Sequence, residues 1–157
     1  MKDVPWKAGL GWALRLGLGG LFVVTGALKL GDVPAFATEI HNYQLFPRFA
    51  PLLAATLPTI EIALGAALIV GRRPWVRAGA LGSTALLAVF TAAVVSVVVR
   101  GINITCGCFG EGSGPVTMLT VVRDVALVAA GAALYRLTRA PAAKAEAASG
   151  KRAATGS

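Results

Sequence analysis

Residues 78–99 read AGALGSTALLAVFTAAVVSVVV, and this stretch contains no charged side chain. A helix needs about 20 predominantly apolar residues to cross the hydrocarbon layer of a bilayer. The stretch therefore predicts a transmembrane helix. Gly79 and Ser83 within it lie four residues apart, as do Gly9, Ala13 and Gly17 earlier in the chain. Small residues at this spacing predict close packing between membrane helices.

Three further apolar runs of similar length lie at about 8–30, 50–70 and 115–137. The first run is longer than the core of a signal peptide and is interrupted by Arg15, so we expect a retained helix. The sequence thus predicts an all-α membrane protein with one domain, residues 1–140, folded as a bundle of four transmembrane helices. Residues 141–157 are mainly Ala, Lys, Gly and Ser without apolar periodicity, and are expected to form a disordered cytoplasmic tail.

The overall composition supports a membrane protein. Charged residues make up 14% of the chain, against about 25% in soluble domains, and hydrophobic residues make up 56%. A soluble chain of 157 residues cannot bury that much apolar surface. The formal net charge is +8, and the basic residues cluster at the ends of the apolar runs. This pattern indicates membrane topology and contact with lipid rather than binding to nucleic acid.

The distribution of Lys and Arg predicts the orientation. When the arginines inside the runs are left out, one side holds three basic residues, Lys29, Arg48 and Arg100, and the other side holds ten. Because basic residues stay on the cytoplasmic side, both termini are expected in the cytoplasm, with residues 31–49 and 100–114 facing outward. The ten cytoplasmic residues are Lys2, Lys7, Arg72, Arg73, Arg77, Arg136, Arg139, Lys144, Lys151 and Arg152.

The first outward segment carries a helical pattern of its own. Asp32 followed by Pro34 is typical of a helix start, and Phe36, Ile40 and Tyr43 then recur on one helical face. We expect a short helix that lies in the membrane interface and covers the outer end of the bundle. Such a helix is either part of a partner-docking surface or a simple connector.

The only two cysteines form the sequence Cys106-Gly107-Cys108 in the second outward segment, where disulfides persist. A disulfide across one residue is strained, which makes it labile and oxidising. It also closes almost no loop and so adds little stability. Thiol–disulfide exchange explains such a pair best. The alternatives are a static disulfide, half of a soft-metal site that would need ligands from another chain, and no role. Within this chain we expect no complete metal site.

Four charged residues fall within the apolar runs: Arg15, Glu61, Arg123 and Asp124. Charges in hydrocarbon are costly and usually face a partner or a cavity. Glu61 and Arg123 lie about 16 Å and 12 Å below the same face, so we expect them to form an ion pair. Arg15 is expected to snorkel to the cytoplasmic surface. The buried charges are either a structural pair or a site that handles protons beside a quinone.

Several short motifs occur in order along the chain: Gly26-Ala27-Leu28-Lys29-Leu30, Asn42-Tyr43, Leu57-Pro58 with Glu61 and Gly65, Arg100-Gly101, Cys106-Gly107-Cys108-Phe109-Gly110, and Arg123-Asp124. In these motifs the chain resembles the MauE branch of the DoxX-like membrane proteins over about residues 8–137. The resemblance implies a four-helix membrane bundle in the bacterial inner membrane. It also implies a role in methylamine utilisation, beside a periplasmic thioredoxin-like protein that forms disulfides in the methylamine dehydrogenase small subunit.

The resemblance extends to chemistry. DoxX relatives are linked to thiosulfate:quinone oxidoreduction, and quinone-linked relatives of vitamin K epoxide reductase are also four-helix bundles. Those reductases relay electrons between two cysteine pairs, whereas this chain has one pair. A quinone would therefore meet Cys106 and Cys108 directly, or electrons would pass to the thiols of a partner.

The leading hypothesis is a membrane thiol–disulfide redox protein in which Cys106 and Cys108 exchange with a periplasmic thioredoxin-like partner. In this hypothesis Glu61, Arg123 and Asp124 form a quinone or proton site. One alternative is a non-catalytic assembly factor with a static disulfide. The other is a small transporter or metal-handling protein that uses Glu61 and Arg123.

Overall fold

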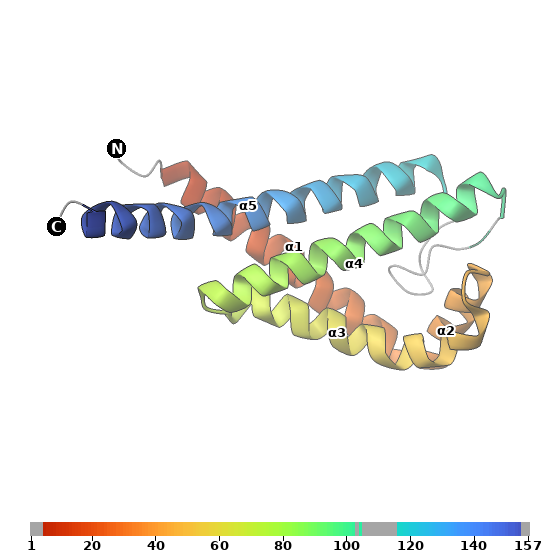
Figure 1. Ribbon diagram of the computed structural model, residues 1–157. Coiled ribbons are helices and arrows are strands. Elements are labelled where there is room, and N and C mark those ends of the chain that lie inside the picture. Colours follow the sequence, from red (N-terminus) through yellow and green to blue (C-terminus); the bar gives the residue numbers. More distant parts are fainter. Residues whose placement is uncertain (1–4, 103, 105–115, 155–157) are drawn as a thin grey trace.

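The computed structural model describes residues 5–102, 104 and 116–154, and no strand occurs among them. Figure 1 shows the helices in chain order. Four of them contain stretches long and apolar enough to cross a membrane, namely 9–31, 47–70, 73–99 and 118–139. The predicted all-α membrane fold with four spans is therefore confirmed. The elements are α1 (Pro5–Gly31), α2 (Val33–Asn42), the short 3₁₀ helix η1 (Pro47–Phe49), α3 (Ala50–Val70), α4 (Arg73–Val99) and α5 (Met118–Ala154).

The long helices form two closely packed pairs. α1 packs mainly against α3, and α4 packs mainly against α5, while contacts between α3 and α4 and between α1 and α5 complete the bundle. α1 begins and α5 ends at one end of the bundle, as an even number of spans requires (Figure 1). α2 lies at the opposite end, which we call the α2 end.

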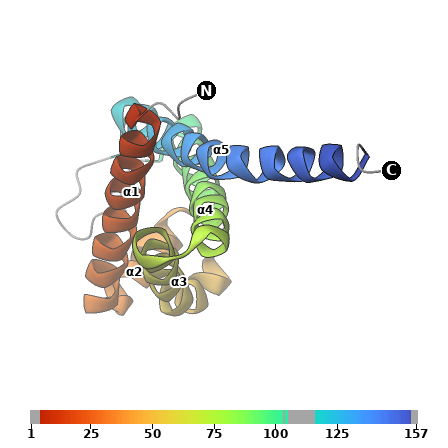
Figure 2. The ribbon, with the colours of Figure 1, turned by 90° about the vertical axis from the view of Figure 1, so that its left-hand side faces the viewer.

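The helix boundaries differ from the sequence expectation at two places. α4 begins at Arg73 instead of residue 78, because Pro74 suits the first turn of a helix. Residues 141–157 were expected to be disordered, whereas α5 continues as helix to Ala154 and projects beyond the bundle (Figure 2). Low hydrophobicity suggested disorder, but this segment is rich in Ala, which has the highest helix propensity.

The short helix expected after the first span is present as α2. The Asp32 side chain caps it by accepting a 2.9 Å hydrogen bond from the backbone N–H of Ala35. Phe36 and Tyr43 are both buried, as the predicted apolar face requires. α2 is packed mainly against α3, so it covers one end of the bundle.

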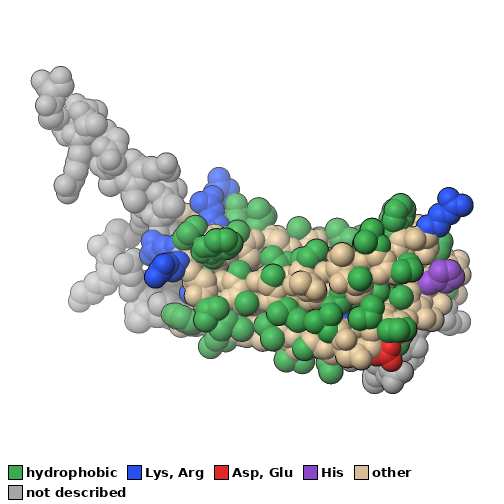
Figure 3. Space-filling view, turned by 90° about the horizontal axis from the view of Figure 1, so that it is seen from below, with side chains coloured by type: hydrophobic (Ala, Val, Ile, Leu, Met, Phe, Trp, Pro, Cys, Tyr) green, Lys and Arg blue, Asp and Glu red, His purple; other side chains and the backbone are tan. Residues whose placement is uncertain are grey.

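The flanks of the bundle are apolar. Large hydrophobic side chains such as Leu16, Val89 and Val122 are more than half exposed. Figure 3 shows hydrophobic side chains along the length of one flank, with Lys and Arg side chains standing out towards its two ends. A surface of this kind is stable only against lipid, so the composition and the exposed surface indicate the same environment.

Glycines decide how closely α1 approaches α3. A Cβ added at Gly65 would lie 2.7 Å from the carbonyl oxygen of Gly19, and one at Gly26 would lie 2.8 Å from that of Pro58. The two helix backbones are therefore in direct contact. The small-residue repeat noted at Gly9 and Gly17 has no such role, because nothing lies within 4 Å of a Cβ at either position. The four-residue spacing of small residues therefore did not identify which face of α1 packs against α3.

The buried apolar residues form two clusters at different heights. One, at the end opposite α2, contains Leu18, Leu68, Val76, Ala80 and Leu134. The other, at the α2 end, contains Tyr43, Val94 and Val97, with Ile104 and Val116 packed against it. The layer between them holds the charged residues described below.

The close α1–α3 contact predicts different effects for two glycine substitutions. Gly65→Ala should lower the free energy of unfolding by about 1–3 kcal/mol, because the added methyl meets backbone that cannot move aside. Gly20→Ala is the matched control, since nothing lies within 4 Å of a Cβ there. Unfolding by SDS titration in mixed micelles measures both. Equal stability of the two variants would contradict the proposed packing.

Candidate functional site

The most buried polar contact between two elements is an ion pair between α1 and α3. Lys29 Nζ lies 2.6 Å from Glu61 Oε1, and the two side chains are 4% and 5% exposed. The Lys29 ammonium also lies 5.0 Å from the centre of the Phe36 ring and 4.9 Å from that of Phe90. A charge with a counterion and two aromatic faces is stabilised in a setting that excludes water.

This pairing corrects the expectation that Glu61 would pair with Arg123. The Glu61 side chain lies beside Gly26, where the α1 and α3 backbones touch, and Lys29 follows Gly26 by one helical turn. Lys29 on α1 is therefore the cation nearest to Glu61. Lys29 was not expected as a partner, because it stands at the end of an apolar run, where a lysine usually indicates topology.

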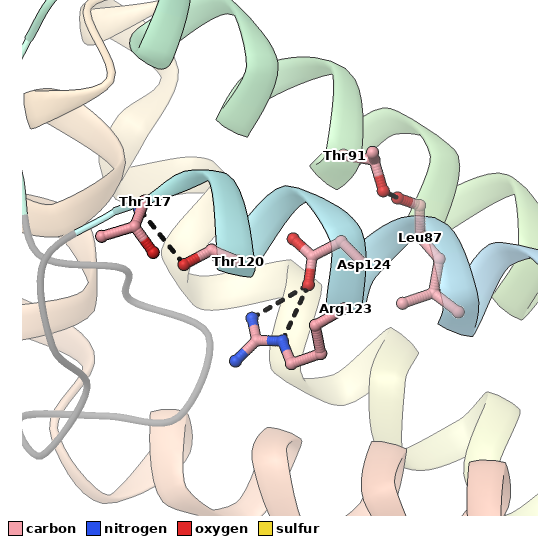
Figure 4. Close-up of polar contacts among 6 residues, drawn as sticks. All are labelled: Leu87, Thr91, Thr117, Thr120, Arg123 and Asp124. Atoms are coloured by element: carbon pink, nitrogen blue, oxygen red, sulfur yellow. Dashed lines mark hydrogen bonds and ion pairs between the residues drawn. The ribbon is translucent and has the colours of Figure 1, made fainter.

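Arg123 instead pairs with its neighbour in the chain. Its Nε and Nη2 atoms donate hydrogen bonds of 3.1 and 2.9 Å to the same oxygen, Oδ1 of Asp124 (Figure 4). The Asp124 side chain is 7% exposed and that of Arg123 is 38% exposed. The pair lies within the second turn of α5, about 9 Å along the helix from Met118.

The two ion pairs line the same cavity, so Glu61, Arg123 and Asp124 lie close together although the expected direct Glu61–Arg123 pair is not formed. The cavity measures about 50 Å³ and is otherwise lined mainly by apolar side chains such as Phe22 and Leu127. Its four charged side chains are formally balanced, two positive and two negative.

Two carboxylate oxygens in this cluster are available for further contacts. Glu61 Oε2 and Asp124 Oδ2 are buried, and no donor in the described part of the chain reaches either of them. Buried carboxylate oxygens normally bind a donor. A polar cavity above about 15 Å³ can hold water. A volume of about 50 Å³ is well below the roughly 300–1,000 Å³ of small-molecule sites, so this cavity fits water and protons but not a quinone ring.

The segment that carries the cysteines leaves the bundle at the α2 end. α4 closes with Gly101 at φ +65°, and the N–H groups of Gly101 and Ile102 donate to the carbonyls of Val98 and Val97. This is the arrangement that glycine favours at helix ends. The Val116 N–H then donates to the Ile104 carbonyl at 3.0 Å, which joins the two ends of the segment. Cys106 and Cys108 themselves lie outside the described residues.

α5 starts immediately after this segment. The Thr117 N–H donates to Oγ1 of Thr120 at 3.3 Å, half of a capping box (Figure 4). Asp124 follows Thr120 by one turn. The charged cavity therefore lies near the start of α5, because Asp124 is about 9 Å along the helix from Met118 and Val116 precedes Met118 by two residues.

Two further arginines hold helix ends. Arg15 donates to the carbonyls of Leu68, Ile69 and Gly71 at 2.8, 3.2 and 3.1 Å, at the C-terminal end of α3. Arg15 therefore binds backbone carbonyls at the end of α3, while its expected snorkelling to the cytoplasmic surface stays a prediction. Arg100 donates to the Tyr43 carbonyl at 2.6 Å and to Ser96 Oγ at 3.3 Å, which fastens the end of α2 to α4.

Comparison with known proteins gives one match. The sequence model of the family described as "Methylamine utilisation protein MauE" matches residues 7–137. Among curated proteins and solved structures, none matches the chain. The matched range covers all four spans and every candidate site residue.

The Lys29–Glu61 pair predicts a strong coupling in a double-mutant cycle. Lys29→Met or Glu61→Met alone leaves one unpaired buried charge and should cost about 3–5 kcal/mol of unfolding free energy, whereas the double variant should cost clearly less than the sum. Unfolding in mixed micelles measures the three variants. Arg15→Met combined with Glu61→Met is the control cycle and should be additive, because Arg15 contacts Trp12 and the end of α3 at Leu68, Ile69 and Gly71, away from Glu61. Additive losses for Lys29 and Glu61 would show that the pair does not form.

Proposed function

The chain belongs to the MauE family of membrane proteins, and from this premise we propose that it is an integral membrane thiol–disulfide redox protein. Cys106 and Cys108 exchange with a periplasmic thioredoxin-like partner. The matching family is described by its role in methylamine utilisation, and we assign the exchange to that process. There the partner forms the disulfides of methylamine dehydrogenase.

The exchange has two balanced steps. A thiolate of the partner attacks the Cys106–Cys108 disulfide, a mixed disulfide forms, and the second partner thiolate releases it, so the partner is oxidised and this chain becomes a dithiol. Reoxidation of the dithiol breaks two S–H bonds, forms one S–S bond, and releases two electrons and two protons. A lipid-soluble quinone takes up these two electrons and two protons and becomes a quinol.

The charged cavity is the observation that supports this function. It lies in the half of the bundle next to the cysteine segment, and two of its buried carboxylate oxygens have no donor among the described residues. Carboxylates in such a setting can accept and pass on protons. A purely structural bundle gains little from four charges in its interior, because a buried ion pair is often no more stable than apolar residues of the same size.

The orientation follows the distribution of basic residues. We place both termini in the cytoplasm and the α2 end in the periplasm of a bacterial inner membrane. Four spans put α1 and the C-terminal end of α5 on the same side, which is compatible with this orientation. A periplasmic cysteine segment is accessible to a thioredoxin-like partner and lies in an oxidising compartment.

The orientation predicts where thiols can be labelled. After mild reduction of intact spheroplasts, a membrane-impermeant maleimide should label Cys106 and Cys108, because both lie on the outer side. Ser149→Cys in a chain with Cys106→Ser and Cys108→Ser is the control and should react only after the membrane is opened. The reverse pattern of labelling would show that the termini lie outside and the cysteines lie in the cytoplasm.

The redox proposal predicts a specific loss when either cysteine is replaced. Cys106→Ser or Cys108→Ser should trap or abolish the mixed disulfide and stop oxidation of the partner, while the bundle stays folded. Alkylation with a mass-tagged maleimide measures the redox state of both proteins. Ser113→Ala, in the same segment, should leave partner oxidation unchanged. Continued partner oxidation in both cysteine variants would indicate a static disulfide and an assembly factor instead.

A further inference from the structure

A second cavity lies at the α2 end of the bundle, between α2, α3 and α4. It measures about 390 Å³, which falls within the range of small-molecule sites. Its lining is apolar and rich in aromatic rings, with Phe36, Tyr43, Phe46 and Phe90 among the residues that form it. We call it the aromatic pocket. None of the residues proposed above to handle protons lines it.

The aromatic pocket and the charged cavity share a wall. Phe90 lines both of them, and Phe36 lines the aromatic pocket. The Lys29 ammonium contacts both rings at about 5 Å from their centres, on the side where it pairs with Glu61. A molecule in the aromatic pocket would therefore be separated from the buried ion pair by the thickness of one aromatic side chain.

The other side of the aromatic pocket borders the base of the cysteine segment. Tyr43 lines the pocket and belongs to the apolar cluster against which Ile104 and Val116 pack. Arg100 holds this corner together through the Tyr43 carbonyl and Ser96. The pocket thus lies between Ile104 and Val116, the described ends of the cysteine segment, and the cavity lined by Glu61 and Asp124.

The opening of the aromatic pocket faces lipid. Phe46 and Val89, which line it, are 64% and 68% exposed, and Ala92 beside them is also exposed. These residues belong to the apolar flank of the bundle. An occupant therefore enters from the bilayer and must itself be soluble in lipid.

We propose that the aromatic pocket binds the ring of a lipid-soluble quinone, with its tail leaving through the opening beside Ala92. This proposal rests on the proposed function, since oxidation of the Cys106–Cys108 dithiol needs an acceptor of two electrons and two protons. Aromatic side chains stack on a flat ring, and the hydroxyl group of Tyr43, which lines the pocket, can donate a hydrogen bond to a quinone oxygen. The two electrons and the two protons both originate in the Cys106–Cys108 dithiol, and Glu61 and Asp124 relay the protons to the ring.

The experiment uses the full chain in lipid nanodiscs and a photoreactive benzoquinone with a decyl tail. Mass spectrometry of the labelled peptides should place the label on α2 and on residues 89–96 of α4. Unlabelled decylbenzoquinone should compete for the site. A photoreactive decane without the ring is the comparison probe, and it should label this site much less.

Two variants at the opening test the site without disturbing the core. Ala92→Trp places a ring in the opening and should lower labelling about tenfold, a change of about 1.4 kcal/mol in binding. Ala88→Trp is the matched control, because Ala88 is exposed one turn away on α4 and does not line the pocket. Phe46→Ala removes an exposed lining ring and should also weaken labelling.

The outcomes separate this proposal from the proposed function. The quinone pocket would be overturned if the probe labelled residues around the charged cavity and not those of the aromatic pocket. Equal labelling by the ring-free probe would overturn it as well. If the pocket is not labelled but the cysteine variants stop partner oxidation, the redox function stands and the pocket assignment falls. If the pocket is labelled and partner oxidation continues without the cysteines, the quinone site stands and the exchange mechanism falls.

Discussion

The buried ion pair between Lys29 and Glu61 is the interaction on which the rest of the structure depends. Neither charge can remain alone in the interior of a membrane protein, so each fixes the position of the other. The pair can form because Gly26 lets the α1 backbone touch that of α3 at the level of Glu61. A glycine contact and a charge pair together set the rotation and height of α1 against α3. The charged layer then separates the apolar core into two clusters.

The same requirement to satisfy polar groups shapes both ends of the bundle. Arg15 binds carbonyl groups at the end of α3, and Arg100 binds the Tyr43 carbonyl at the end of α2. A cation at a helix C-terminus is favourable, because the last carbonyls have no partner within the helix. Arg100 has the larger consequence, since it holds α2 against α4 and so closes one side of the aromatic pocket. A contact that stabilises a helix end thus also forms the wall of a candidate site.

These constraints produce two adjacent compartments of opposite character. The charged cavity is small, holds four charged side chains among apolar ones, and suits water and protons. The aromatic pocket is larger and apolar, and opens towards lipid. Phe90 separates them, while the base of the cysteine segment borders the aromatic pocket. This division places the ring site among aromatic side chains, while the carboxylates of Glu61 and Asp124 lie in the adjacent cavity.

The sequence by itself determined the four spans, the family and the short helix α2, because hydropathy, motif order and the Asp32 cap are local properties of the chain. It also indicated compatible depths for Glu61 and Arg123, since depth follows from residue count along a helix. Only the tertiary structure decided that Lys29 pairs with Glu61 and that Arg123 pairs with Asp124. Which side chains pair depends on the rotation of each helix and on which helices touch. The depth of a residue along its helix carries no information about either. The aromatic pocket has the same origin, because its lining comes from three helices that meet only in the folded bundle.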